Sequence, residues 1–197
     1  MNASFIKRFL AGLTDIIILG ALIYLMMLVF NPTNNENIIK INNEIETLNS
    51  NLLEQEVSYQ NYVNQYADLM YMLDKEEVMV NVFNVIFIII LYIIIPFITG
   101  GSTIGKKLLR IKVVKNNGDK LNLNEYFLRS LLINYLGYLL VTLALIFIVN
   151  SFSYFIIGLI LILFEILLVI ISAFMILYRH DKRGLHDLIA HTKVVNI

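Results

Sequence analysis

The chain has 197 residues, of which 58% are hydrophobic and 15% are charged, with 15 Lys and Arg against 15 Asp and Glu. So apolar a composition excludes an ordinary soluble domain, and the zero net charge gives no sign of a nucleic-acid partner. The absence of cysteine excludes disulfides and thiolate metal sites.

The first membrane span is predicted within residues 1–30. Residues 9–30 hold one ionisable side chain, Asp15, and about 20 apolar residues rising about 1.5 Å each suffice to cross the hydrocarbon core. The run is too long for a signal peptide, so we expect a retained helix. A carboxylate is costly inside a span, so Asp15 should face protein or water. It either pairs with a cation or belongs to an ion or substrate site.

Residues 31–77 are predicted to form a long extracytoplasmic helical hairpin. Apolar and aromatic residues recur there at alternating intervals of four and three, the seam of a helix that packs on another helix. The chain must return to the membrane, which favours an antiparallel hairpin, and the Asn-rich residues 48–51 offer a turn. Two interpretations stay open: a cap that packs on itself, or a surface for a protein partner or a second copy.

The second span is predicted at residues 78–99. This segment is uncharged and contains Asn84. Pro96 lies near its end, where it should kink the helix or mark its last turn.

The loop at residues 100–129 is rich in Lys and Arg and alternates apolar and basic residues at 109–114. A turn at 116–119 and a second alternating stretch at 121–123 predict a small cytoplasmic β-hairpin, which residues 192–195 could join as a third strand. The glycines at 100–105 do not have the spacing of a phosphate-binding loop.

Residues 130–178 are long enough for the third and fourth spans, with a turn at 150–153, and Glu165 is their only charge. Glu165 falls near the bilayer centre, where desolvation should keep its carboxyl neutral. Two roles stay open for Glu165. It belongs to a proton-coupled cation site, in which Asp15 is a second binding position and Asn84 and Asn134 are neutral ligands, or it forms a hydrogen bond between helices.

The orientation follows from the Lys and Arg count. Thirteen of these residues lie in the first eight positions, the 100–129 loop and the 179–197 tail, whereas residues 31–77 contain two against nine acids. The positive-inside rule therefore predicts a multi-pass cell-membrane protein with both termini in the cytoplasm.

Three motifs occur in a characteristic order. Arg8 precedes Asp15 by seven residues, residues 105–114 read GKKLLRIKVV, and residues 183–195 read RGLHDLIAHTKVV. Together they resemble the RDD family of small bacterial membrane proteins, named for one arginine and two aspartates, which by motif are Arg8, Asp15 and Asp187. The resemblance implies transport, with sodium/proton exchange proposed for some members. The 31–77 segment and Glu165 lie outside the family pattern.

The triad residues need partners. Arg8 and Asp15 share a helix face but lie about 10 Å apart along the axis, so we expect Arg8 to pair with Asp187 and Asp15 to reach Arg129. Such pairs would make the triad a structural clasp that pins the tail under the bundle.

The sequence thus predicts an all-α membrane protein: a four-helix transmembrane bundle with a long extracytoplasmic helical hairpin and a small cytoplasmic β-hairpin. We expect a small cation/proton-coupled transporter in the lipid bilayer, working as a homo-oligomer. The alternative is a membrane adaptor or regulator that binds a partner through its outer hairpin. No catalytic group or cofactor motif is apparent, so an enzyme is not expected. His186 and His191 do not share a helix face, so neither is a metal site.

Overall fold

The computed structural model describes residues 2–30 and 35–197, and it is mainly helical. Met1 and residues 31–34, where the predicted hairpin segment begins, lie outside the described residues. The helices are α1 (Phe5–Phe30), α2 (Glu36–Leu53), α3 (Tyr59–Glu76), α4 (Val78–Ile89), the π-helical turn η2 (Ile90–Ile94), α5 (Ile95–Thr99), α6 (Ile104–Leu108), α7 (Leu123–Ile133), α8 (Leu136–Leu145), α9 (Ser151–Tyr178) and α10 (Leu185–Ile189), and the strands are β1 (Ile111–Lys115) and β2 (Thr192–Asn196).

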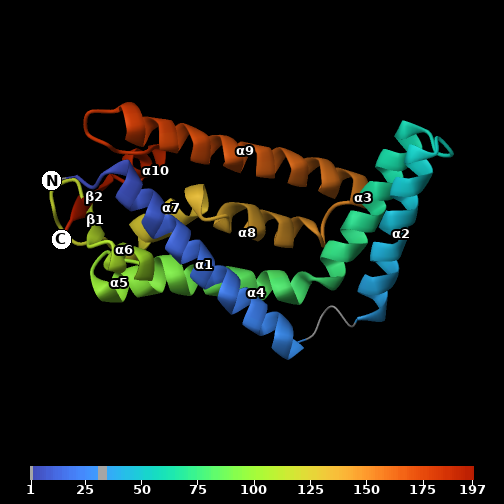
Figure 1. The fold of residues 1–197 in the computed structure, drawn as a ribbon, viewed down its shortest axis with the longest axis horizontal. Coiled ribbons are helices and arrows are strands. Elements are labelled where there is room, and N and C mark those ends of the chain that lie inside the picture. Colours follow the sequence, from blue (N-terminus) through green and yellow to red (C-terminus); the bar gives the residue numbers. More distant parts are fainter. Residues whose placement is uncertain (1, 31–34) are drawn as a thin grey trace.

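The predicted all-α membrane protein is confirmed. Among the described residues, three helical stretches are long and apolar enough to cross a membrane, namely residues 5–30, 78–99 and 151–178. The helices α7 and α8 qualify as a fourth only if the bent pair is one span. Figure 1 shows α4, α8 and α9 along the long axis and α1 crossing them obliquely, with both termini at one end. Large apolar side chains such as Ile16 and Phe164 remain more than half exposed, as expected of helices that face lipid.

The sequence predicted a continuous helix from residue 130, but the structure has a bent pair of helices there. The pair begins earlier, at Leu123, and α8 bends away from α7 by 77°. Tyr135 has a left-handed backbone at the break, with φ of 64°. A Cβ on Gly137 would lie 2.8 Å from the carbonyl oxygen of Leu131, so the tight turn requires glycine there.

The small sheet pairs β1 with β2 in antiparallel register, from Ile111 opposite Asn196 to Lys115 opposite Thr192. The tail therefore contributes a strand, as the sequence suggested. The predicted hairpin with residues 121–123 is wrong, because Asn122 and Glu125 form a capping box that starts α7 there.

The α2–α3 hairpin is antiparallel, but its turn lies at residues 54–58 and not at the predicted 48–51. The α2 helix continues through the Asn-rich stretch, where the Ser50 hydroxyl donates to the carbonyl of Thr47 at 2.8 Å within the helix. Ser58 then caps α3. The hairpin lies across the end of the bundle opposite the termini, where α3 contacts α9 (Figure 1).

Pro96 acts as the sequence predicted. A proline cannot donate a backbone hydrogen bond, and the helix becomes π-helical at Ile90–Ile94 just before it and ends at Thr99. Gly100 closes the helix in a left-handed conformation, with φ of 73°.

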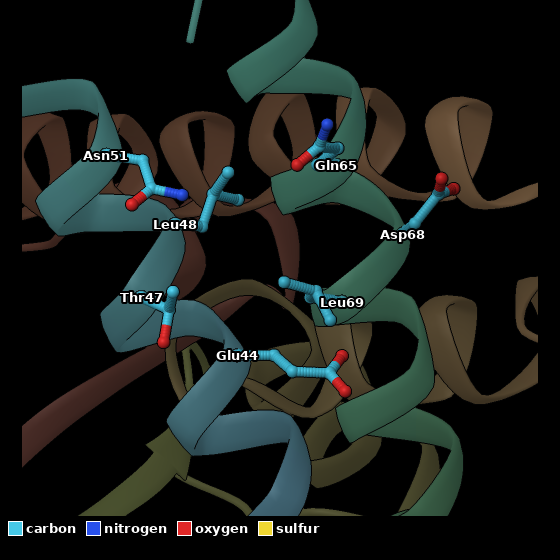
Figure 2. A pocket seen from close by; sticks show the side chains of 7 residues that line it. All are labelled: Glu44, Thr47, Leu48, Asn51, Gln65, Asp68 and Leu69. Carbon is cyan, nitrogen blue, oxygen red and sulfur yellow. The ribbon is translucent and has the colours of Figure 1, made fainter. Parts of the chain in front are cut away.

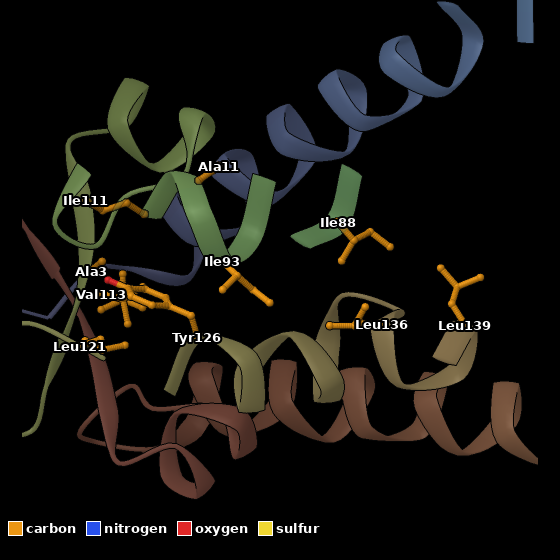
Figure 3. Packing of buried hydrophobic residues seen from close by; sticks show 11 residues of the cluster. Ala3, Ala11, Ile88, Ile93, Ile111, Val113, Leu121, Tyr126, Leu136 and Leu139 are labelled. Atoms are coloured by element: carbon orange, nitrogen blue, oxygen red, sulfur yellow. The ribbon is translucent and has the colours of Figure 1, made fainter. Parts of the chain in front are cut away.

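The main buried apolar cluster lies toward the end of the bundle that carries the termini (Figure 3). It joins α1, α4, η2, the two strands, α7 and α8, so the sheet is packed into the bundle and does not hang below it. Its members are Ala3, Ala11, Ile88, Ile93, Ile111, Val113, Leu121, Tyr126, Leu136, Leu139 and Val194.

Candidate functional site

Asp187 is the centre of a buried charge cluster that joins three distant parts of the chain. Its side chain is fully buried on α10, and the predicted ion pair with Arg8 is present, with 2.7 Å between Nη1 and Oδ2. Arg129 of α7 donates to the other carboxylate oxygen and also to the hydroxyl of Thr192. The Gly184 N–H donates to Oδ2 at 3.1 Å. We call Arg8, Arg129 and Asp187 the charge cluster.

The charge cluster keeps Asp187 ionised. Burial alone would raise the pKa of Asp187, but the positive charges of Arg129 and Arg8 and the hydrogen bond from Arg129 hold it far below the usual range. The side chains of Arg8 and Arg129 are only 9% and 6% exposed. These charges are therefore desolvated, so removing one partner leaves the others uncompensated.

Asp15 does not reach Arg129, contrary to the expectation from the sequence. Its carboxylate accepts a hydrogen bond from the Thr103 hydroxyl at 2.5 Å and another from the Gly105 N–H at 2.7 Å. The reason is close packing of α6 on α1, where a Cβ on Gly105 would overlap the carbonyl of Ala11. Asp15 thus fixes the loop after the second span, and Arg129 is left for Asp187.

Two basic side chains beside the charge cluster, His186 and Lys106, have lowered pKa values. Burial lowers the pKa of His186 to about 3, so its ring is neutral, and its Nδ1 lies 2.6 Å from the Ser172 hydroxyl of α9. Burial and the charge of Arg129 lower the pKa of Lys106 to about 8, despite Asp15 and Asp187 nearby.

Glu165 lies in the middle of α9, 8% exposed, against the break in the third span. Its carboxylate interacts with the backbone of Tyr135 and Tyr138, so Glu165 faces the N-terminal end of α8, where backbone N–H groups lack partners within the helix. Its Oε1 atom has no hydrogen-bond partner among the described residues. A buried carboxylate with an open oxygen therefore lies within a candidate membrane span, beside the bend between α7 and α8.

The other residues expected at an ion site are spread out. Asn134 ends α7 and donates to the Ser130 hydroxyl at 3.2 Å. Asn84, on α4, has a buried Oδ1 without a partner in the described part of the chain. No hydrogen bond or ion pair between described residues joins any two of Asp15, Asn84, Asn134 and Glu165.

Several polar residues of the site were not singled out from the sequence. The Thr103 hydroxyl donates to Asp15, and the Thr192 hydroxyl accepts from Arg129. The Ser172 hydroxyl is hydrogen-bonded to His186. Only Thr103 had a local signal, since it precedes a short helix as an N-cap residue would. The other two depend on which helices meet, which no spacing in the sequence reveals.

A groove on the α2–α3 hairpin, of about 380 Å³, is the other candidate (Figure 2). Leu48 and Leu69 form its apolar floor, and polar side chains border it. Within residues 2–30 and 35–197, no group of three or more His, Asp or Glu is placed to hold a metal ion. The lining residues are Glu44, Thr47, Leu48, Asn51, Gln65, Asp68 and Leu69.

The sequence model of the RDD family matches residues 2–191. It thus extends over the first two motifs, the hairpin and residues 183–191 of the third motif. No curated protein and no solved structure matches the chain.

Proposed function

The chain belongs to the RDD family of membrane proteins, and from that premise we propose that it is a small transporter that couples the movement of a cation to that of a proton. Glu165 is the proton-carrying carboxyl. The charge cluster of Arg8, Arg129 and Asp187 is the clasp that holds the termini end of the bundle in shape.

The observation that carries this proposal is the open Oε1 oxygen of Glu165 at the break between α7 and α8. An ionisable side chain within a span is costly and is rarely kept without a function. Discontinuous helices near the bilayer centre expose backbone groups that bind ions or substrates. Glu165 combines both features, because it faces the free amides of α8 and keeps one oxygen for a proton or a cation.

We also propose that both termini and the charge cluster face the cytoplasm of the cell. The support is the concentration of Lys and Arg at that end of the bundle. Since four helices can enclose little of a pathway alone, the transporter works as a homo-oligomer.

The experiment is a transport assay in proteoliposomes with sodium, potassium and proton gradients. Glu165→Gln keeps an oxygen for the α8 amides and removes the titrating group, so we expect a folded protein that has lost cation-driven proton movement. Glu46→Gln makes the same chemical change at an exposed hairpin position and should leave transport intact. Unchanged proton movement in Glu165→Gln would reduce Glu165 to a helix cap and refute the proposal.

A second candidate function is an adaptor that binds a protein partner through the hairpin. The groove between α2 and α3 favours it, because polar side chains border an apolar floor that includes Leu69. Two measurements separate the two functions. An adaptor loses partner binding when residues 35–76 are deleted, and its full chain shows no transport. A transporter shows Glu165-dependent proton movement in the full chain.

A further inference from the structure

The basic residues of the first eight positions, the 100–129 loop and the tail divide into those with partners and those without. A first group makes side-chain hydrogen bonds or ion pairs, namely Lys7, Arg8, Lys115, Arg129, Arg179, Arg183 and Lys193. The others make none within the described part of the chain, and most of them lie close together in the sequence. They are Lys106, Lys107, Arg110, Lys112, Lys120 and Lys182.

The charge of residues 106–112 is not balanced by nearby acids. Neither Asp nor Glu occurs between residues 78 and 118. The two buried acids of this end are already occupied, since Asp15 binds the α6 loop and Asp187 binds two arginines. The described residues thus offer no acid partner to Lys107 or Arg110.

The short helix α6 has an inner and an outer face. Gly105 faces α1, because its N–H donates to Asp15 and a Cβ there would overlap the α1 backbone. Ile104, Lys107 and Leu108 share another face, being three and four residues apart. Ile104 is 37% exposed and Leu108 is 67% exposed, and Lys107 is exposed as well. The outer face therefore presents two apolar side chains and one cation.

The helix α6 lies at the depth where lipid head groups meet the acyl chains. Gly105 packs against Ala11, which is six residues, or about 9 Å, from the start of α1. The second candidate span ends at Thr99, just before α6. Figure 1 shows α6 beside α1 at the end of the bundle that carries the termini. Exposed apolar side chains at this depth contact lipid.

Arg110 adds a second cation at the end of α6. Its N–H donates to the Lys107 carbonyl at 3.2 Å, so the two residues lie on one turn. Its φ is 54°, in the left-handed region where glycine usually ends a helix. A residue other than glycine is costly there. Arginine supplies what glycine lacks, a guanidinium group that can bind a phosphate through two parallel hydrogen bonds.

We propose that Ile104, Lys107, Leu108 and Arg110 form a binding site for an anionic phospholipid. Lys107 and Arg110 bind the phosphate, and Ile104 and Leu108 contact the acyl chains. Free phosphate would leave the apolar side chains uncovered, and an acidic protein in water would not reach this depth. The site goes beyond the proposed function, because it depends neither on Glu165 nor on transport.

The test is fluorescence quenching by lipid, and it uses the fact that the chain contains no tryptophan. Leu108→Trp places one on the outer face of α6. The protein is reconstituted in bilayers of phosphatidylcholine and phosphatidylglycerol in fixed proportion, with bromine on one lipid or on the other. Bromine quenches a tryptophan that it contacts, so the two measurements give the lipid preference. Val29→Trp, 78% exposed near the other end of α1, is the control position.

We expect brominated phosphatidylglycerol to quench Leu108→Trp more strongly than brominated phosphatidylcholine. Lys107→Gln combined with Arg110→Gln should lower this preference at least about fivefold, since one basic residue near the surface contributes roughly that factor. The double variant should still be quenched by phosphatidylcholine, because α6 stays at the interface. Lys120→Gln combined with Lys182→Gln removes the same charge outside the site and should leave the preference unchanged.

Three results would refute the site. Equal quenching by the two lipids in Leu108→Trp would leave Lys107 and Arg110 to water or to an acidic protein. Equal losses in the two double variants, or the same preference in Val29→Trp, would mean that the lipid responds only to overall charge. Replacing chloride by inorganic phosphate at constant ionic strength should change nothing, and loss of the preference would assign the site to free phosphate.

Discussion

Replacing Asp187 by asparagine should cost the bundle much of its stability. The carboxylate accepts from Arg8, Arg129 and the Gly184 N–H, whereas asparagine offers one oxygen and turns two donor hydrogens toward these groups. Both arginines would then be buried without a counter-charge. Breaking one partner of such a desolvated pair costs about 3–5 kcal/mol.

That loss is large enough to measure as a melting temperature in detergent. For a chain of 150–250 residues, 1 kcal/mol corresponds to roughly 2–4 °C, so Asp187→Asn should melt roughly 6–20 °C lower than the wild type. Asp181→Asn is the control, because its ion pairs with Arg179 and Arg183 lie at the surface of the same tail and such pairs contribute little. A shift in Asp187→Asn no larger than that of the control would refute the desolvated cluster.

Three further predictions follow from the same end of the bundle. Gly105→Ala should destabilise by about 1–3 kcal/mol through overpacking against α1, measured as a lower melting temperature, while Gly12→Ala, with open space around it, should not. The depressed pKa of Asp187 means that its contribution to stability is complete above the unfolded pKa of about 3.9 and is lost as the pH falls further. The wild type should therefore lose stability below about pH 4 more steeply than Asp187→Asn. A reporter active only in the cytoplasm should work at Asn117 and fail at Asn51, and the reverse would overturn the orientation.

Features encoded locally were predictable from the sequence, and those that depend on packing were not. The apolar spans and the effect of Pro96 follow from run length and from the missing N–H. The pair of Arg8 with Asp187 followed from their common level in the membrane. The break at Tyr135 could not be predicted, because a left-handed tyrosine is unfavourable unless its surroundings compensate for it, and those surroundings include Glu165 from a different helix.

The two errors at the 100–129 loop have different causes. The residues of the capping box, Asn122 and Glu125, are visible in the sequence, and they start a helix where the short alternation at 121–123 predicted a strand. The partner of Arg129 had no such signal. The close approach of Gly105 to α1 decides which partner Arg129 has. It places the Gly105 N–H against the Asp15 carboxylate, so Asp15 is already paired and does not bind an arginine.

The charge cluster also constrains when this end of the bundle can assemble during translation. Asp187 follows Arg8 by 179 residues and Arg129 by 58. At about 5–20 residues per second, the ribosome completes Asp187 roughly 9–36 s after Arg8 and roughly 3–12 s after Arg129. In that interval both guanidinium groups must remain in water or among lipid head groups, since neither can enter the hydrocarbon alone. The nascent bundle therefore stays open and hydrated at this end until translation reaches α10, and ribosome stalling before that point leaves a membrane protein with two unpaired arginines for quality control to detect.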